Sequence, residues 1–229
     1  MRLDKFIAHS SGLSRKEVKR ALHQGIICID NQPVKNGGTL VNEQQHITLD
    51  GQHLQLSGPR YFILHKPQGV VCANQDSSYP TALDLLSDEK QDGLQIAGRL
   101  DVDTTGLVLI TDDGQWNHRA TSPKVGKNKT YRVTTSEPIS DAQMAELAAG
   151  VQLKGESKVC RAADITRLES SLALLTISEG KYHQVKRMFA AVGNHVVALH
   201  RQSIGDITLD TDLAEGQYRA LTEREINSI

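Results

Sequence analysis

The sequence is poor in cysteine and in aromatic residues, and it has no long apolar run. Its 229 residues include only three cysteines, Cys28, Cys72 and Cys160, which lie far apart and form no paired spacing. This excludes a disulfide framework and a zinc site built on cysteine pairs, and it indicates a reducing compartment. The first twenty residues are too charged for a signal peptide, and no later stretch is apolar enough to span a bilayer. We therefore expect a cytoplasmic protein without membrane association.

A large net charge is also missing. The chain has 26 basic and 27 acidic residues, for a net charge of −1, so any binding to nucleic acid has to rest on local clusters. Hydrophobic residues make up 38% and charged residues 23%, which is typical of a folded globular protein. The nine histidines show no metal-ligand spacing. We therefore expect no bound metal and no cofactor.

The first sixty residues predict a small module of two helices and a few short strands. The residues from Ser14 to Glu17 form a capping box, which satisfies backbone donors at the start of a helix. This helix should run to about His23 and end at Gly25. Its exposed side is basic and consists of Arg15, Lys16, Lys19 and Arg20.

This module resembles the small RNA-binding domain first known from ribosomal protein S-four. The resemblance rests on Arg2-Leu3-Asp4-Lys5, Ser14-Arg15 with the basic helix, Gly25, and Ile27-Cys28-Ile29-Asp30. It implies an RNA-binding domain over residues 1–57, with the basic side of the helix on RNA, followed by a second domain over residues 58–229. The plain alternative is a small helical cap with a solvated basic face.

From Tyr61 onward, strands and helices alternate without an evident repeat. A second capping box, from Ser140 to Gln143, should open a helix that ends at Gly150. Val185, Met188, Phe189 and Val192 share one helical face and predict another helix, which should end at Gly193. Strands are expected at residues 61–65, 131–135 and 172–177. The pattern indicates an α+β fold with a mixed, largely antiparallel sheet.

The most informative segment spans residues 97–110, where a Gly-Arg-Leu-Asp sequence ending at Asp101 precedes a glycine turn and an apolar run. This order predicts a loop that displays Asp101 at the mouth of a strand. The spacing also fits the start of a calcium loop. However, Leu109 stands where an oxygen donor is needed, and the short Asp112 stands where a bidentate Glu is needed. We therefore exclude a calcium loop.

A basic segment follows between Gly114 and Ser136, which contains no Asp or Glu. Trp116 and Tyr131 lie among its charges, and such mixing of basic and aromatic residues favours nucleic-acid binding over a merely solvated face. The five basic residues are Arg119, Lys124, Lys127, Lys129 and Arg132.

Four motifs together closely resemble those of the RNA pseudouridine synthases. They are Lys66-Pro67-Gln68-Gly69, residues 98–107, Lys129-Thr130-Tyr131, and residues 180–188. With the N-terminal module, they point to the branch that joins an S-four-type domain to a synthase core, and the resemblance covers almost the whole chain. Members acting on large-subunit rRNA typically carry Gly-x-Asn-Arg-Gln-Val-Arg-Arg-Met where this chain has Gly-Lys-Tyr-His-Gln-Val-Lys-Arg-Met. The pattern therefore favours 16S, small-subunit rRNA, with 23S rRNA as the alternative.

The resemblance implies that Asp101 is the essential carboxylate in converting uridine to pseudouridine. Asp101 would act either as a nucleophile at the anomeric carbon or as a base at the adjacent ribose carbon. Lys186, where related branches carry Arg, would keep Asp101 ionised through an ion pair. Tyr131 would stack on the displaced uracil and help the late proton transfer from the ring carbon. The plain alternatives are an exposed helix residue for Lys186 and the start of a strand for Tyr131.

A target uridine in folded RNA has to be flipped out of its stack. We expect Arg99 beside the flipped nucleotide, and His183 to be structural or to face RNA rather than bind a metal. The expected partner is small-subunit rRNA, free or within a partly assembled ribosomal particle, bound by a monomer. Flanking phosphates should be held by Lys124, Lys127, Lys129 and Arg187.

Two other classes of function stay open from the residues alone. One is a non-catalytic RNA-binding factor for ribosome assembly. The other is a glycoside-type hydrolase that uses Asp101 and Asp103. Carboxylates two residues apart on an extended strand point to opposite faces, which argues against the hydrolase unless a turn breaks the alternation.

Overall fold

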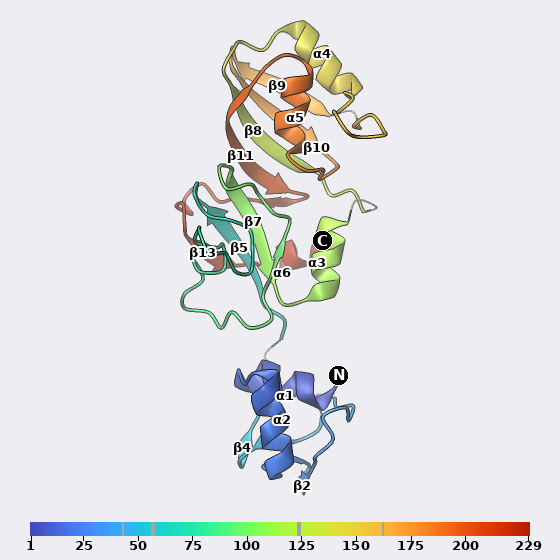
Figure 1. Cartoon of the computed structure of the whole chain (residues 1–229), viewed down its shortest axis with the longest axis vertical. Coiled ribbons are helices and arrows are strands. Elements are labelled where there is room, and N and C mark those ends of the chain that lie inside the picture. Colours follow the sequence, from blue (N-terminus) through green and yellow to red (C-terminus); the bar gives the residue numbers. More distant parts are fainter. Residues whose placement is uncertain (43, 56–57, 123–124, 162) are drawn as a thin grey trace. The chain divides into compact units, whose positions relative to one another are not determined.

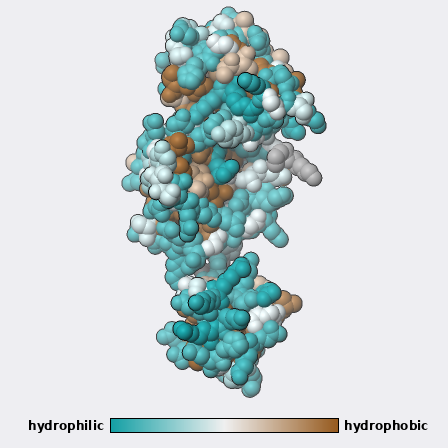
Figure 2. All heavy atoms as spheres, in the orientation of Figure 1, coloured by the Kyte–Doolittle hydropathy of each residue, from teal (hydrophilic) through white to brown (hydrophobic). Residues whose placement is uncertain are grey.

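The computed structural model describes residues 1–42, 44–55, 58–122, 125–161 and 163–229. The chain divides into two compact units, Met1–Pro59 with Glu89–Gly93, and Arg60–Asp88 with Leu94–Ile229. Figure 1 shows the path of the chain through both. Within the described ranges, no helix combines the length and the apolar character that crossing a membrane requires. Hydrophilic residues make up most of the visible surface of each unit in Figure 2.

The first unit contains two helices and a four-stranded antiparallel sheet with the order β2-β1-β3-β4. Its elements are α1 (Leu3–Ser11), α2 (Arg15–Gln24), β1 (Ile27–Ile29), β2 (Gln32–Pro33), β3 (Ile47–Leu49) and β4 (Gln52–His53). The predicted capping box at Ser14 is confirmed, and α2 ends at Gly25, which is left-handed with φ of 72°. Val18 packs in the core of this unit, whereas the four basic residues of α2 are exposed.

The second unit is built on a mixed sheet in which most neighbours are antiparallel, as the sequence predicted. Its main path has the order β13-β5-β7-β11-β8-β10-β9, with β12 on β11 and β6 on β7. The strands are β5 (Tyr61–Lys66), β6 (Gln95–Ala97), β7 (Thr105–Thr111), β8 (Lys129–Thr135), β9 (Asp164–Glu169), β10 (Leu172–Ile177), β11 (Val196–Ile204), β12 (Ile207–Thr208) and β13 (Tyr218–Ala220). The helices are α3 (Gly114–Thr121), α4 (Asp141–Ala149), α5 (Gln184–Ala191) and α6 (Glu223–Asn227).

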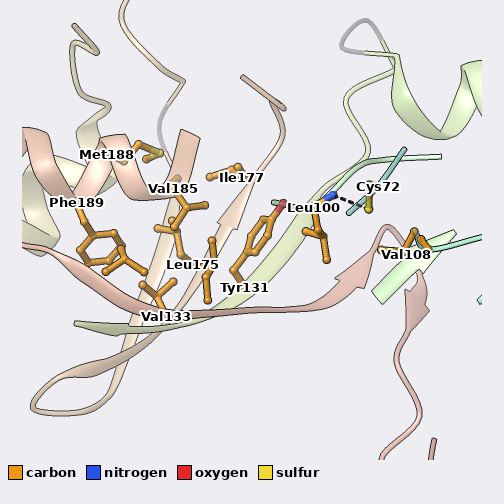
Figure 3. Close-up of a cluster of buried hydrophobic side chains, with 14 of the residues drawn as sticks. Cys72, Leu100, Val108, Tyr131, Val133, Leu175, Ile177, Val185, Met188 and Phe189 are labelled. Atoms are coloured by element: carbon orange, nitrogen blue, oxygen red, sulfur yellow. Dashed lines mark hydrogen bonds between the residues drawn. The ribbon is translucent and has the colours of Figure 1, made fainter. Parts of the chain in front are cut away.

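One short parallel contact joins the two halves of this sheet. Here β11 pairs with β7 through His200 opposite Thr105 and Arg201 opposite Gly106. Away from this junction, α5 packs its apolar face on β8 and β10, as Figure 3 shows for Phe189 and its neighbours. On the other half, α3 and α6 are connected by a hydrogen bond of 2.9 Å from Trp116 Nε1 to the Ile226 carbonyl. The junction is therefore where segments from both halves meet.

A charged cluster fastens α6 to this unit and predicts a pH dependence. Arg219 on β13 donates to Glu225 Oε1 at 2.8 Å and to Asp210 Oδ2 at 2.5 Å. Glu225 also accepts from the Thr222 backbone in the capping box of α6. The hydrogen bond from Arg219, followed by those from Thr222, outweighs burial and lowers the pKa of Glu225 from 4.5 to about 2.

The stabilisation by ionised Glu225 is therefore fully present above pH 4.5 and is lost as the pH falls toward about 2. We expect Glu225→Gln to lower the free energy of unfolding by roughly 2 kcal/mol at pH 7. This difference from wild type should shrink steadily in urea unfolding series between pH 4.5 and pH 2. The control Glu223→Gln, on the exposed side of α6, should change stability little at any pH. A Glu225→Gln deficit that does not vary with pH would contradict the assignment.

Candidate active site

Asp101 lies in the loop between β6 and β7, at the mouth of β7 where the sequence placed it, and its side chain is 30% exposed. Three contacts hold this loop. The Thr104 amide donates to the Asp101 carbonyl at 3.1 Å, and the Gly69 amide donates to the Val102 carbonyl at 2.8 Å. The Leu100 amide donates to Cys72 Sγ at 3.3 Å (Figure 3). The backbone of the loop is therefore fixed independently of the Asp101 carboxylate.

The start of α5 supplies the groups that face this carboxylate. His183 Nε2 lies 3.3 Å from Asp101 Oδ1, and Lys186 Nζ lies 3.4 Å from Asp101 Oδ2. Lys186 lies in the first turn of α5, and His183 is the left-handed residue that precedes the helix, so the helix start presents both side chains to the loop. The structure thus brings together Asp101 and Lys186, as the sequence predicted. It also places His183, expected only to be structural or to face RNA, against the carboxylate.

Lys186 contacts a second carboxylate more closely than the first. Its Nζ donates to Asp103 Oδ1 at 2.6 Å, and this hydrogen bond is the main cause that lowers the pKa of Asp103. Because residues 101–104 form a turn, Asp101 and Asp103 converge on one ammonium group instead of pointing to opposite faces. A turn therefore breaks the strand alternation at this segment, and alternation does not argue against a hydrolase here.

Tyr131 lies on β8 with only 8% of its surface exposed, in the core shown in Figure 3. Its neighbour in register on β11 is Arg201, whose Cζ is 6.0 Å from the centre of the tyrosine ring. Arg201 is 2% exposed, and it donates from Nε to the Leu107 carbonyl at 2.8 Å and from Nη2 to the Gly98 carbonyl at 2.5 Å. This buried cation connects β8, β7 and the start of the Asp101 loop.

Nothing in the sequence singles out Arg201, because a single arginine in a strand is usually exposed. Lys66 stands in the sequence only as the first residue of the Lys66-Pro67-Gln68-Gly69 motif, yet it is fully buried. Its Nζ donates to the carbonyls of Pro67 at 2.8 Å and Val102 at 3.4 Å, and burial lowers its pKa. Two buried cations therefore support the backbone on either side of Asp101.

The basic residues expected on RNA have different surroundings. Arg99 is exposed two residues before Asp101 in the chain, whereas Lys129 is only 7% exposed and burial lowers its pKa. Lys127 donates to the Ser228 carbonyl at 2.6 Å. Arg187 is paired with Glu156 Oε1 at 3.1 Å. Lys124 lies outside the described residues.

In chemical terms, the site is a partly exposed carboxylate with an ammonium group and an imidazole on its two oxygens. A carboxylate held in this way can attack an electrophilic carbon or remove a proton. Tyr131 adds an aromatic ring that reaches into the same core as Leu100 of the loop.

Comparison with known proteins covers both units. Residues 60–191 match a family model described as RNA pseudouridylate synthase, and residues 1–47 match the S4 domain. The ribosomal small subunit pseudouridine synthase A of Yersinia pestis is 52% identical over 100% of this chain and 98% of that protein. The protein of the same name from Escherichia coli K12 is 51% identical over the full length of both. A crystal structure of a pseudouridylate synthase superposes with a TM-score of 0.72 at 47% identity, covering 100% of this chain and 99% of the other.

Proposed function

The chain belongs to the RNA pseudouridylate synthase family, and from this membership we infer that it converts one uridine of 16S rRNA to pseudouridine. The substrate class is supported by full-length relatives whose names specify the small ribosomal subunit. The observation that carries the chemistry is the carboxylate of Asp101, held between His183 and Lys186.

In the proposed reaction, Asp101 starts the cleavage of the bond between ribose C1′ and uracil N1. It does so either by attacking C1′ or by removing a proton from C2′. The detached uracil turns and C5 bonds to C1′, which displaces the Asp101 carboxylate in the first route and is accompanied by return of the proton to C2′ in the second. The proton on C5 then leaves while N1 gains one. The product is an isomer of the substrate, so no external group is consumed. Lys186 is the ion-pair partner of the Asp101 carboxylate, and Tyr131 lies along the turning base with its hydroxyl available for the late proton transfer.

In this proposal, the exposed basic side chains bind the RNA substrate. We assign RNA docking to residues 1–57, through the exposed basic side of α2, and catalysis to residues 58–229. Arg99 then contacts the flipped nucleotide, and Arg187 and Lys127 lie on the flanking RNA. The enzyme acts as a monomer in the cytoplasm, on 16S rRNA or on a partly assembled small subunit.

The experiment that tests this function is carbodiimide mapping by primer extension of unmodified 16S and 23S transcripts after incubation with the protein. The 16S transcript is used both free and partly assembled with ribosomal proteins. We expect a single new stop, in 16S rRNA only. A stop confined to 23S rRNA would keep the chemistry and overturn the substrate. Binding without any stop would favour an assembly factor, and release of free uracil would indicate a hydrolase.

A further inference from the structure

An aromatic side chain stands exposed at the edge of the candidate site. Tyr182 is 75% exposed. Aromatic residues make up only 4% of the chain, and five of them are tyrosines, so an exposed ring at this place is unusual. Its ring is stacked on that of His183, with centroids 3.8 Å apart and planes inclined by 20°. His183 in turn touches Asp101. The exposed ring is therefore one side chain away from the proposed catalytic carboxylate.

The backbone that carries Tyr182 is held in place. The Tyr182 carbonyl accepts a hydrogen bond of 3.0 Å from Arg187, which is itself anchored on Glu156 Oε1 at 3.1 Å and on the Lys154 carbonyl at 2.6 Å. The next residue, His183, is left-handed with φ of 45°, an uncommon conformation for a residue with a side chain. Such conformations cluster at ligand-binding sites, where the surrounding contacts impose them.

RNA offers flat base faces on which an exposed aromatic ring can stack. When a uridine is flipped into a site, the neighbouring base loses a stacking partner, and its exposed face has to be covered. Aromatic side chains cover such faces in proteins that bind single-stranded nucleic acid, because every base has a π-face. Lys186 and Arg187, which follow this position in the chain, are already paired with carboxylates, so the exposed ring is what this position offers to RNA.

We propose that Tyr182 is a stacking platform for the unpaired base next to the target uridine, and that His183 sets the position of its ring against the Asp101 loop. This rests on the proposed function and adds a subsite to it. Tyr182 binds RNA and takes no part in bond making. Its loss should therefore affect capture and placement of the substrate more than the chemical step.

The test uses 16S RNA in which an abasic nucleotide replaces, one at a time, each residue flanking the mapped uridine. We expect Tyr182→Ala to lower kcat/KM by about 10- to 100-fold, mainly through KM, and Tyr182→Phe to stay close to wild type. At one flanking position, the abasic nucleotide should reduce kcat/KM of wild type by a similar factor and have no further effect on Tyr182→Ala.

The matched control is Leu168→Ala, which removes an exposed apolar side chain on the edge strand β9 and should leave activity unchanged. Losses that simply add at every flanking position, or a Tyr182→Ala enzyme as active as wild type, would overturn the subsite. A Tyr182→Ala protein that binds and modifies RNA normally but loses association with a ribosomal protein would instead place a protein partner there. If wild type forms no pseudouridine even in unsubstituted RNA, the proposed function itself fails.

Discussion

Replacing Asp101 by Asn should abolish pseudouridine formation and leave RNA binding unchanged. The amide keeps the shape of the side chain, and the backbone of the loop is held by contacts of Thr104, Leu100 and Val102 that do not involve the carboxylate. What is lost is the negative charge that either proposed role requires. We expect a fall in the single-turnover rate of at least about 10³-fold, because the removed group takes part in bond making or proton transfer.

Asp103→Asn is the matched control, since it removes a neighbouring carboxylate that shares Lys186. It should retain most of the activity, because Lys186 then has Asp101 as its remaining anionic partner. Filter binding to 16S rRNA at fixed salt should give the same affinity for wild type and both variants. Equal losses of activity in the two variants, or an active Asp101→Asn protein, would show that the reacting carboxylate has been assigned wrongly.

Local features of the fold could be predicted because the residues that determine them are neighbours in sequence. Both capping boxes, at Ser14 and Ser140, are present with the predicted partners Glu17 and Gln143. The strand expected at residues 172–177 has those bounds. The loop that displays Asp101 could also be read from its glycines and the apolar run that follows.

The supporting cations of the site could not be predicted in the same way. Arg201 and Lys66 bond to backbone carbonyls of Leu107, Gly98 and Val102, which come within reach only when the strands assemble. Sequence alone shows a carbonyl at every position and gives no sign of which ones are left open to a side chain. The burial of Lys66 could not be predicted either, because this residue ends a strand whose sequence pattern fits an exposed end as well as a buried one.

The place of His183 was also missed for a physical reason. From the sequence it is expected only to be structural or to face RNA, because its contact with Asp101 depends on a left-handed backbone and on the packing of α5 near the loop. The alternation rule failed for Asp101 and Asp103 because it applies to extended strands, and these residues lie in a turn. Tertiary contacts therefore complete a site of which the sequence shows only the central carboxylate and its ion pair.

Gly106→Ala should be the most destabilising substitution at the junction between β7 and β11. Gly106 has φ of +108°, and a Cβ added there would lie 2.3 Å from the Arg201 carbonyl oxygen and 2.7 Å from its nitrogen. Both neighbours are backbone atoms, so relief requires the strands to separate. Adding the backbone strain to the overlap, we expect a loss of about 4 kcal/mol in the free energy of unfolding, measured in urea.

Gly155→Ala separates the two causes, because Gly155 has φ of +82° and open space where a Cβ would stand. It should cost only the backbone strain, about 1 kcal/mol. Equal losses in the two variants would mean that the contact with Arg201 adds nothing.

The junction has a further consequence for activity, since Arg201 is hydrogen-bonded to Gly98 at the start of the Asp101 loop. Displacing β11 should therefore lower the pseudouridine-forming rate of the Gly106→Ala protein that stays folded, whereas folded Gly155→Ala protein should react like wild type.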